Sequence, residues 1–347
     1  MSTAMGASST GVTRIEGIRE GYNKMSSNSG FERCFLTGGA GFIGSHLVEQ
    51  LLADEKTVTV YDNLSSGRRE SIERSLGRPG FTFIKADLLD VPKLQDAMAG
   101  HDFVIHLGAN TDIPAGNKDV RLDLENCTIA THNVLEAMRA TGISRLLFSS
   151  TSAGYGEAPK IPSPEDIGPL LPISLYGAAK LACETLISAY CHVFKMQAWM
   201  FRFANVVGSR MEHGVIHDFI VKLKRNPEEL EILGDGQQEK SFFLVEDCID
   251  GMFSAFRNSD AWCDVFNLGC PSGTRVTRVA EIIAEEMGLS DVRFRYTGGR
   301  SGWVGDVPLT RLDVSKMKKL GWEAKHTSDE AVRTAARRLL GIANPVS

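Results

Sequence analysis

The sequence predicts a doubly wound α/β fold, and three observations lead to this prediction. From residue 33 onward, short apolar runs rich in β-branched residues alternate with segments of helical periodicity. The apolar runs are too hydrophobic to have one face in water, which is typical of a parallel sheet covered by helices on both sides. The chain has 347 residues, of which 43% are hydrophobic and 23% charged, enough for one large domain or two smaller ones.

The elements follow one another in strand–helix order as far as Asn205, and longer connections with shorter elements come after it. We expect a smaller C-terminal α/β domain there, packed over the carboxyl edge of the sheet, where open sheets of this class bind their ligands. The expected strands cover residues 33–37, 57–61, 81–85, 102–107, 145–150 and 197–203. The expected helices include residues 124–140 and 175–194. The shorter elements expected after Asn205 include residues 214–225, 246–256, 275–288 and 328–340.

Composition excludes several classes of partner. Lys and Arg number 38 against 43 Asp and Glu, so the net charge of -5 offers no basic field to a nucleic acid polymer or an anionic membrane. No stretch approaches the roughly 18 apolar residues of a membrane helix, and residues 1–30 lack the apolar core of a signal peptide. The seven cysteines are scattered, without a CxxC pair, and indicate reduced thiols and no metal site. We therefore expect a cytoplasmic protein whose residues 1–30 form a mobile tail or leader.

A glycine-rich segment follows the first strand, in CFLTGGAGFIGSHLVEQLL at residues 34–52. Gly38 permits a tight turn, Gly41 lets the backbone approach a pyrophosphate, and Gly44 allows close packing of helix and strand. The N-terminus of the following helix supplies amide donors and a partial positive charge. This segment predicts a dinucleotide-binding loop.

Two acidic residues support this interpretation. Asp62 ends the second strand, in the position that accepts hydrogen bonds from an adenosine ribose. Its carboxylate favours NAD over NADP because it repels a 2′-phosphate, although Arg68 and Arg69 follow closely and favour the phosphate. Asp87, after the third strand, is either an acceptor for the adenine amino group or a surface helix cap.

The candidate catalytic residues lie further along the chain. Tyr176 and Lys180 are four residues apart at the start of a helix, so both side chains lie on one face. A phenol has a pKa of about 10, and a neighbouring ammonium lowers it toward the working range of a base. Thr151 and Ser152 end a strand, where one hydroxyl could bind a reacting oxygen or serve only the turn. Taken alone, a Tyr and a Lys at this common spacing would be interpreted as an interface residue and a solvated cation; the preceding dinucleotide-binding pattern favours the catalytic interpretation.

At this point the sequence resembles a known family. The segments TGGAGFIGSHL, DNLSSG, SSTSAGYGE, LYGAAK and FRFANVVG resemble the extended short-chain dehydrogenases that modify nucleotide sugars, and among them the UDP-glucose 4-epimerase-like group. The resemblance covers roughly residues 31–340. We expect an NAD-binding Rossmann domain over 31–205 with a return segment at about 235–262, and a sugar-nucleotide domain over 206–234 and 263–340.

The resemblance also implies residue roles. Thr151, Tyr176 and Lys180 would form the catalytic triad, Asn126 would support the lysine through a water network, and Asn205 would face the sugar and its diphosphate. Tyr176 would take the proton of the 4-hydroxyl while hydride passes from C4 to NAD⁺, and hydride would return to the other face of the ketose. The expected NAD contacts are Gly38, Gly41, Phe42, Ile43, Gly44, Asp62, Asn63, Asp87, Leu88, Ala109, Asn126, Tyr176 and Lys180.

Residues near Thr151 discriminate among branches of the resembled family. The 4,6-dehydratases carry an Asp-Glu pair there, and UDP-xylose synthases and GDP-mannose 3,5-epimerases carry a Glu or a Cys at the second position. This chain has Ser152 and Ala153, which favours 4-epimerisation of a UDP-hexose. Two alternatives stay open: another 4-keto-sugar enzyme with an acid or base elsewhere, such as Cys127 or His213, and a nucleotide-sensing binding module.

The substrate side departs from the family pattern. Lys240 and Trp303 stand where the family usually has diphosphate-binding arginines. Our hypothesis is that Lys240 and Arg300 hold the diphosphate, with Ser152 beside the sugar and Trp303 either near the nucleotide or packing as a lid. Thr310 aligns with the gate for sugar size and would admit 2-acetamido sugars. The resemblance further implies a homodimer formed through the 124–140 and 175–194 helices.

Overall fold

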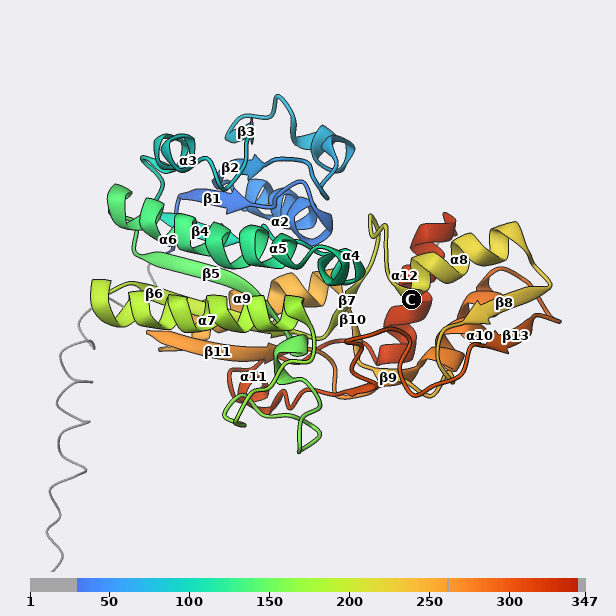
Figure 1. Ribbon diagram of the computed structural model, residues 1–347. Helices are drawn as coiled ribbons and strands as arrows, with labels where there is room; N and C mark the ends of the chain where they lie inside the picture. Colours follow the sequence, from blue (N-terminus) through green and yellow to red (C-terminus); the bar gives the residue numbers. More distant parts are fainter. Residues whose placement is uncertain (1–29, 261, 343–347) are drawn as a thin grey trace, which may run out of the picture. The chain divides into compact units, whose positions relative to one another are not determined.

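The structure is a computed structural model that describes residues 30–260 and 262–342. Its centre is a parallel seven-stranded sheet with the strand order β11-β6-β5-β4-β1-β2-β3, which confirms the predicted fold class (Figure 1). The strands of this sheet are β1 (Arg33–Thr37), β2 (Thr57–Asp62), β3 (Phe81–Lys85), β4 (Phe103–His106), β5 (Arg145–Thr151), β6 (Gln197–Phe203) and β11 (Cys263–Leu268).

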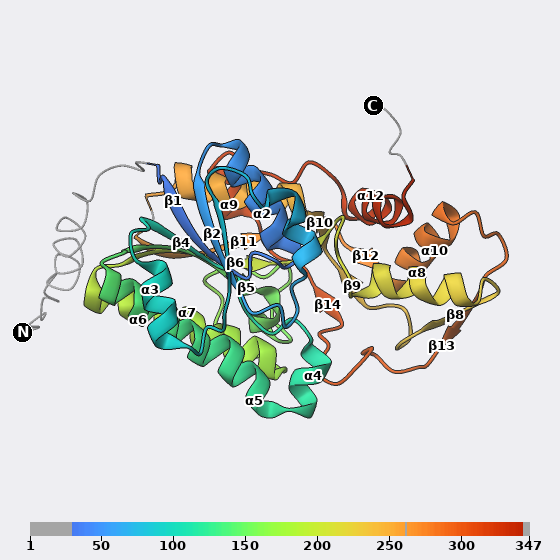
Figure 2. The ribbon, with the colours of Figure 1, turned by 90° about the horizontal axis from the view of Figure 1, so that it is seen from above.

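Helices cover both faces of the sheet (Figure 2). On one face lie α2 (Phe42–Ala53) and α9 (Val245–Asn258), and on the other lie α3 (Val91–Met98), α6 (Ala130–Thr141) and α7 (Leu175–Phe194). Successive residues of a strand point to opposite faces, so Leu36 of β1 belongs to the core under α2 and α9, and Phe35 to the core under α6 and α7. Both residues are fully buried, which is why the strands have no polar face.

The six predicted strands are present, and the seventh was not foreseen. β11 pairs in parallel with β6, and its Phe266, Asn267 and Leu268 are buried. The boundary expected at residue 263 is therefore wrong for the sheet, because residues 263–268 form its edge strand instead of part of the smaller domain. The preceding helix α9 returns the chain to the sheet, as a parallel crossover requires.

The helix expected over 124–140 is divided. Its first part, η2 (Leu124–Ile129), is a π-helical segment, and only α6 after it is α-helical. Two short helices, α4 (Ile113–Lys118) and α5 (Val120–Asp123), precede it. A π-helical segment inside an α-helix is rare and occurs frequently at functional sites.

The C-terminal part has a core of its own. It is built from α8 (Val215–Arg225), α10 (Val276–Glu286), α12 (Ser328–Leu340) and the pair β8 (Glu229–Ile232) and β13 (Arg293–Tyr296). Small sheets join it to the main one: β10 (Phe242–Leu244) with β7 (Asn205–Val207), and β9 (Glu239–Lys240) between β12 (Thr274–Arg275) and β14 (Leu309–Thr310). The remaining short helices are η1 (Arg69–Ser75), η3 (Ser152–Tyr155) and α11 (Ser315–Lys319).

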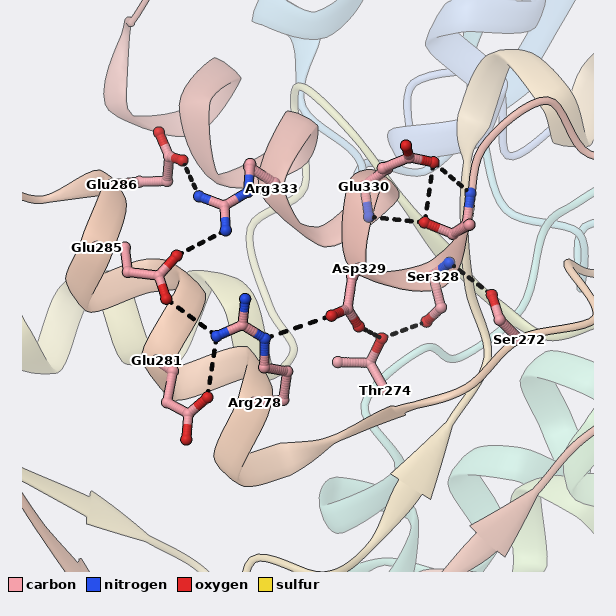
Figure 3. Close-up of polar contacts among 11 residues, drawn as sticks. Ser272, Thr274, Arg278, Glu281, Glu285, Glu286, Ser328, Asp329, Glu330 and Arg333 are labelled. Atoms are coloured by element: carbon pink, nitrogen blue, oxygen red, sulfur yellow. Dashed lines mark hydrogen bonds and ion pairs between the residues drawn. The ribbon is translucent and has the colours of Figure 1, made fainter.

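Polar contacts fasten α12 to α10 (Figure 3). Arg278 of α10 contacts Glu285 at 2.9 Å and Asp329 of α12 at 3.3 Å, and Arg333 of α12 reaches Glu285 and Glu286. Thr327 caps the start of α12 reciprocally with Glu330. Within residues 30–260 and 262–342, no helix is long and apolar enough to cross a membrane.

Candidate active site

The glycine loop between β1 and α2 lies at the carboxyl edge of the sheet. Gly38 has a φ of 71°, in the left-handed region that favours glycine. A Cβ atom on Gly44 would lie 2.2 Å from the Gly38 carbonyl oxygen, so the helix can pack here only without a side chain. No side chain caps the first turn of α2, which follows Gly41, and such an N-terminus suits a phosphate.

Asp62 holds this loop in place. Its Oδ2 accepts a hydrogen bond from the Ala40 amide at 3.0 Å, and its Oδ1 accepts one from the Leu64 amide at 2.8 Å. The side chain is almost completely buried, and burial raises the pKa of the carboxyl group. A carboxylate has about four acceptor sites, so Asp62 retains capacity for ribose hydroxyls.

One pocket brings most of the predicted cofactor residues together. Asn63 reaches across it, with its Nδ2 donating to Asp87 Oδ2 at 2.8 Å. Phe42 and Ile43 lie on α2 beside the pocket and pack against the core instead of lining it. The predicted residues that do line the pocket are Gly38, Gly41, Asp62, Asn63, Asp87, Leu88, Ala109 and Asn126.

The two arginines after β2 are engaged elsewhere. Arg68 forms an ion pair with Glu212 at 2.5 Å, and the Arg69 guanidinium lies 5.7 Å from the centre of the Phe83 ring. Neither residue lines the pocket that contains Asp62. The arrangement favours a cofactor with a free ribose 2′-hydroxyl over one with a 2′-phosphate.

The predicted catalytic residues meet where β5 ends and α7 begins. Ser174 caps α7 by accepting a hydrogen bond from the Gly177 amide at 3.1 Å, and Tyr176 and Lys180 lie in its first two turns. Thr151 is the last residue of β5, and its hydroxyl accepts from the Ala153 amide at 3.1 Å, which begins η3. Ser152 is the first residue of η3.

Electrostatics around Tyr176 combine opposing effects. Burial raises the pKa of its phenol, the charge of Asp123 raises that pKa further, and a hydrogen bond with Thr151 lowers it. The Lys180 ammonium is buried and donates to the Ser149 carbonyl at 2.7 Å. Together these effects leave the pKa of the Tyr176 phenol above its ordinary value.

Asp123 and Asn110 are partners that the sequence did not point out. Asp123 is 1% exposed, and its Oδ1 accepts from Asn110 Nδ2 at 2.9 Å, while its Oδ2 is buried without a partner. Burial raises the pKa of Asp123, and the charge of Lys180 lowers it. Asp123 precedes the predicted site residue Asn126 by one helical turn. This spacing is the sequence feature that could have indicated Asp123 as a further site residue. Asn126 itself donates to the Leu122 carbonyl at 3.0 Å.

A buried histidine joins the glycine loop to α6. His106, at the end of β4, contacts the Thr37 hydroxyl through Nδ1 at 2.6 Å and the Thr131 hydroxyl through Nε2 at 3.0 Å. Burial lowers the pKa of its imidazole to about 3, and the charge of Lys180 adds to this effect. His106 is thus a neutral structural link.

The two predicted diphosphate ligands differ in their contacts and in their exposure. Lys240 Nζ contacts Asp306 Oδ1 at 2.8 Å and also the Val307 carbonyl. Arg300 is 75% exposed and lies 3.6 Å from Glu157. Lys240 therefore fastens a loop of the C-terminal part, whereas Arg300 extends into solvent.

Asn205 and Thr310 lie close to Lys240 in the small sheets. Asn205 Nδ2 donates to the Ser241 carbonyl at 3.3 Å, and Thr310 is the register partner of Lys240 between β14 and β9. The turn at Trp303 is closed by the Asp306 amide, which donates to the Trp303 carbonyl at 3.1 Å. Both residues are thus linked to Lys240, Thr310 through strand pairing and Trp303 through the turn that contains Asp306.

The alternative acids and bases differ in access. Cys127 is 1% exposed, and burial raises the pKa of its thiol. His213 is exposed and lies two residues before the start of α8. Among the described residues, no group of three or more His, Cys, Asp or Glu side chains is placed to hold a metal ion.

The fold and site together define a class of protein. A glycine loop after β1, an acid at the end of β2, and a Tyr–Lys pair beside the end of β5 all lie at the carboxyl edge of one parallel sheet. This arrangement is typical of dinucleotide-dependent enzymes that move a hydride.

Comparison with known proteins identifies the family. The chain belongs to the NAD dependent epimerase/dehydratase family, which it matches over residues 34–269, and NAD is its cofactor. It is 31% identical over 305 residues to the putative UDP-glucose 4-epimerase of Methanocaldococcus jannaschii, covering 86% of this chain and 95% of the relative.

Other relatives widen the range of reactions. The UDP-glucuronic acid decarboxylase 1 of Xenopus tropicalis is also 31% identical, with coverage of 86% of this chain and 70% of that protein. A crystal structure of a UDP-galactose 4-epimerase matches with a TM-score of 0.79 and 40% identity, over 89% of this chain and 99% of that one. Family membership therefore leaves the particular reaction to be inferred from the site.

Proposed function

We propose that this protein interconverts the C4 epimers of a UDP-hexose, of the UDP-glucose and UDP-galactose type, by transient oxidation at C4. The observation that carries the proposal is the composition of the turn after β5: Thr151 is followed by Ser152 and Ala153. Neither side chain can remove a C5 proton or protonate a leaving group. Oxidation and reduction at C4 is the chemistry that the neighbouring Tyr176 supports.

The residues of the pocket suit NAD in its extended form. Gly38 and Gly41 leave room for the pyrophosphate at the start of α2, and Asp62 would accept hydrogen bonds from the adenosine ribose. Asn63 and Asp87 would face the adenine side of the pocket. NAD, when bound, supplies the acceptor and donor of the hydride at C4.

The chain's own residues would handle the proton. Tyr176 would take the proton of the sugar 4-hydroxyl and return it after the ketose has presented its other face. Thr151 would hydrogen-bond to the same oxygen, as it does to the phenol. Lys180, fixed by the Ser149 carbonyl, and Asn126 would hold the ribose and water beside it.

The substrate would extend toward the C-terminal part. Asn205 and Ser152 would face the sugar and its diphosphate, and Lys240 has one ammonium hydrogen left to offer after its contacts with Asp306 and Val307. Arg300 would supply the second positive charge by leaving Glu157. Thr310, beside Lys240, is small enough to admit a 2-acetamido group.

A second candidate is decarboxylation or dehydration, because a UDP-glucuronic acid decarboxylase is among the relatives. Two observations count against it: Ala153 stands where UDP-xylose synthases would have a glutamate, and Cys127 is buried with a raised thiol pKa. The deciding experiment is incubation of the purified protein with UDP-glucose, UDP-galactose, their 2-acetamido forms and UDP-glucuronic acid, with products analysed by NMR. A C4 epimer supports the proposal, whereas a pentose or a 6-deoxy-4-keto product would overturn it.

We further propose a homodimer formed through the region of η2, α6 and α7. Several apolar side chains of this region are exposed, among them Leu124, Ile129, Leu175, Val193 and Phe194. Exposed apolar residues on adjacent helices are typical of subunit contacts. Light scattering after size-exclusion chromatography would show about twice the chain mass, and a monomer at micromolar concentration would refute the dimer.

A further inference from the structure

A buried ion pair lies beneath the catalytic helix. Glu184 of α7 and Arg202 of β6 have only 6% and 5% of their side chains exposed. Arg202 grips the carboxylate with two nitrogens, Nε to Oε1 at 3.0 Å and Nη2 to Oε2 at 2.7 Å. A fork of this kind fixes the orientation of both side chains as well as their separation.

A residue of β5, Ser150, also contacts this ion pair. The Ser150 hydroxyl donates to Glu184 Oε1, and Ser150 lies between Ser149, which holds Lys180, and Thr151. Glu184 follows Lys180 by four residues and therefore lies on the same face of α7. The carboxylate thus ties α7 to both β5 and β6 at the level of the catalytic residues.

Arg202 also contacts residues nearer the edge of the sheet. Its Nη1 donates to the Glu165 carbonyl at 3.3 Å, and its guanidinium lies 4.7 Å from the centre of the Tyr155 ring. The Tyr155 hydroxyl donates to Asn267 Oδ1 at 2.7 Å, and Asn267 of β11 is fully buried. Tyr155 ends η3, so the contacts also support the turn that Thr151 begins.

We propose that Glu184 and Arg202 are positioning residues for the proposed C4 oxidation. Through Ser150 and α7, the pair would keep the side chains of Thr151, Tyr176 and Lys180 in fixed positions relative to one another. Replacing a buried ion pair with apolar residues often leaves stability unchanged, so net stabilisation is a weak reason for this pair. Alignment is a stronger one, since misplacing a reacting group by about 1 Å can lower a rate about 100-fold.

The main variant is Glu184→Met with Arg202→Met, which removes the pair without leaving an unpaired buried charge. We expect kcat to fall about 100-fold, KM for the UDP-hexose to stay within about threefold, and bound NAD to remain. Arg202→Lys keeps the charge but loses the fork, and we expect it to recover part of kcat.

The control is Glu286→Gln in the C-terminal part. Glu286 has 8% of its side chain exposed and pairs with Arg333 and with Arg337, so it is a buried carboxylate of similar kind far along the chain (Figure 3). This variant should lower thermal stability and leave kcat unchanged. An equal loss of kcat in the control would mean that ion pairs act only through general stability.

Hydrogen exchange gives a readout that does not depend on turnover. In the double variant we expect faster exchange confined to residues 149–153 and 175–184, and in the control no change there. If the wild-type protein shows a kcat near zero on every UDP-hexose, the proposed function is wrong. The hydrogen-exchange measurement would still test whether the ion pair positions these two segments. Unchanged exchange in those two segments, or a double variant with wild-type kcat, would overturn the positioning role.

Discussion

The Lys180 ammonium donates a hydrogen bond to the Ser149 carbonyl at 2.7 Å, although the two residues are 31 positions apart in the chain. The same ammonium lies 4.7 Å from the centre of the Phe148 ring. Both partners belong to β5, so the strand places this charge directly before Thr151, where the strand ends. The lysine is therefore fixed from the sheet, and its position does not depend on helix geometry alone.

Removing the proposed base should stop catalysis without unloading the cofactor. Tyr176→Phe deletes the phenol hydroxyl and leaves the ring, so kcat should fall by about 10² to 10⁴ while bound NAD is retained. Turnover is followed by NMR and NAD by absorbance after denaturation. Tyr190→Phe is the matched control, because Tyr190 lies on the same helix with its hydroxyl on Glu136. Retained turnover in Tyr176→Phe would refute the assigned base.

The buried acid Asp123 should influence the pH dependence. Its negative charge raises the pKa of Tyr176, so Asp123→Asn should lower that pKa and move the acid limb of the kcat profile to lower pH. The control is Asp119→Asn, which changes an exposed cap of α5. A limb that stays in place, or moves to higher pH, would contradict the electrostatic role of Asp123.

The close approach at Gly44 predicts a steric effect. Its Cβ would lie 2.2 Å from the Gly38 carbonyl oxygen, so Gly44→Ala must displace the glycine loop. Overpacking of this kind costs about 1 to 3 kcal/mol, and we expect a lower free energy of unfolding together with reduced NAD content. Gly302→Ala is the comparison, since its nearest neighbours are at 3.5 Å. Normal NAD content in Gly44→Ala would show that the loop tolerates the shift.

Arg300 offers a test of the proposed diphosphate site. The Arg300 side chain is 75% exposed and lies 3.6 Å from Glu157, so its guanidinium is available to a ligand. Arg300→Ala should weaken UDP binding about tenfold in calorimetry, consistent with loss of one charged hydrogen bond. Glu157→Gln releases the arginine and should leave affinity equal or stronger. An unchanged dissociation constant in Arg300→Ala would remove this residue from the site.

Local pattern was sufficient for most of the main sheet. The apolar runs ending at Thr37, Asp62 and Thr151 form strands within one residue of the predicted ends, because a strand buried on both faces must be apolar throughout. The sequence pattern did not predict β11, because its first three residues are only half-buried and do not form an apolar run. Its place in the sheet depends on pairing with β6 and not on its own composition.

By itself, the sequence determined the fold class, the glycine loop, Asp62 and the Tyr176–Lys180 pair, since each depends on residues close together in the chain. Only the tertiary structure revealed that Asp123 is buried beside the pair, that Lys240 is held by Asp306, and that Glu184 is gripped by Arg202. These contacts join elements that are distant in the chain. The local sequence around a charged side chain does not indicate which residue it will contact. Their pairing arises only when packing excludes water and brings each charged group within hydrogen-bond distance of its partners.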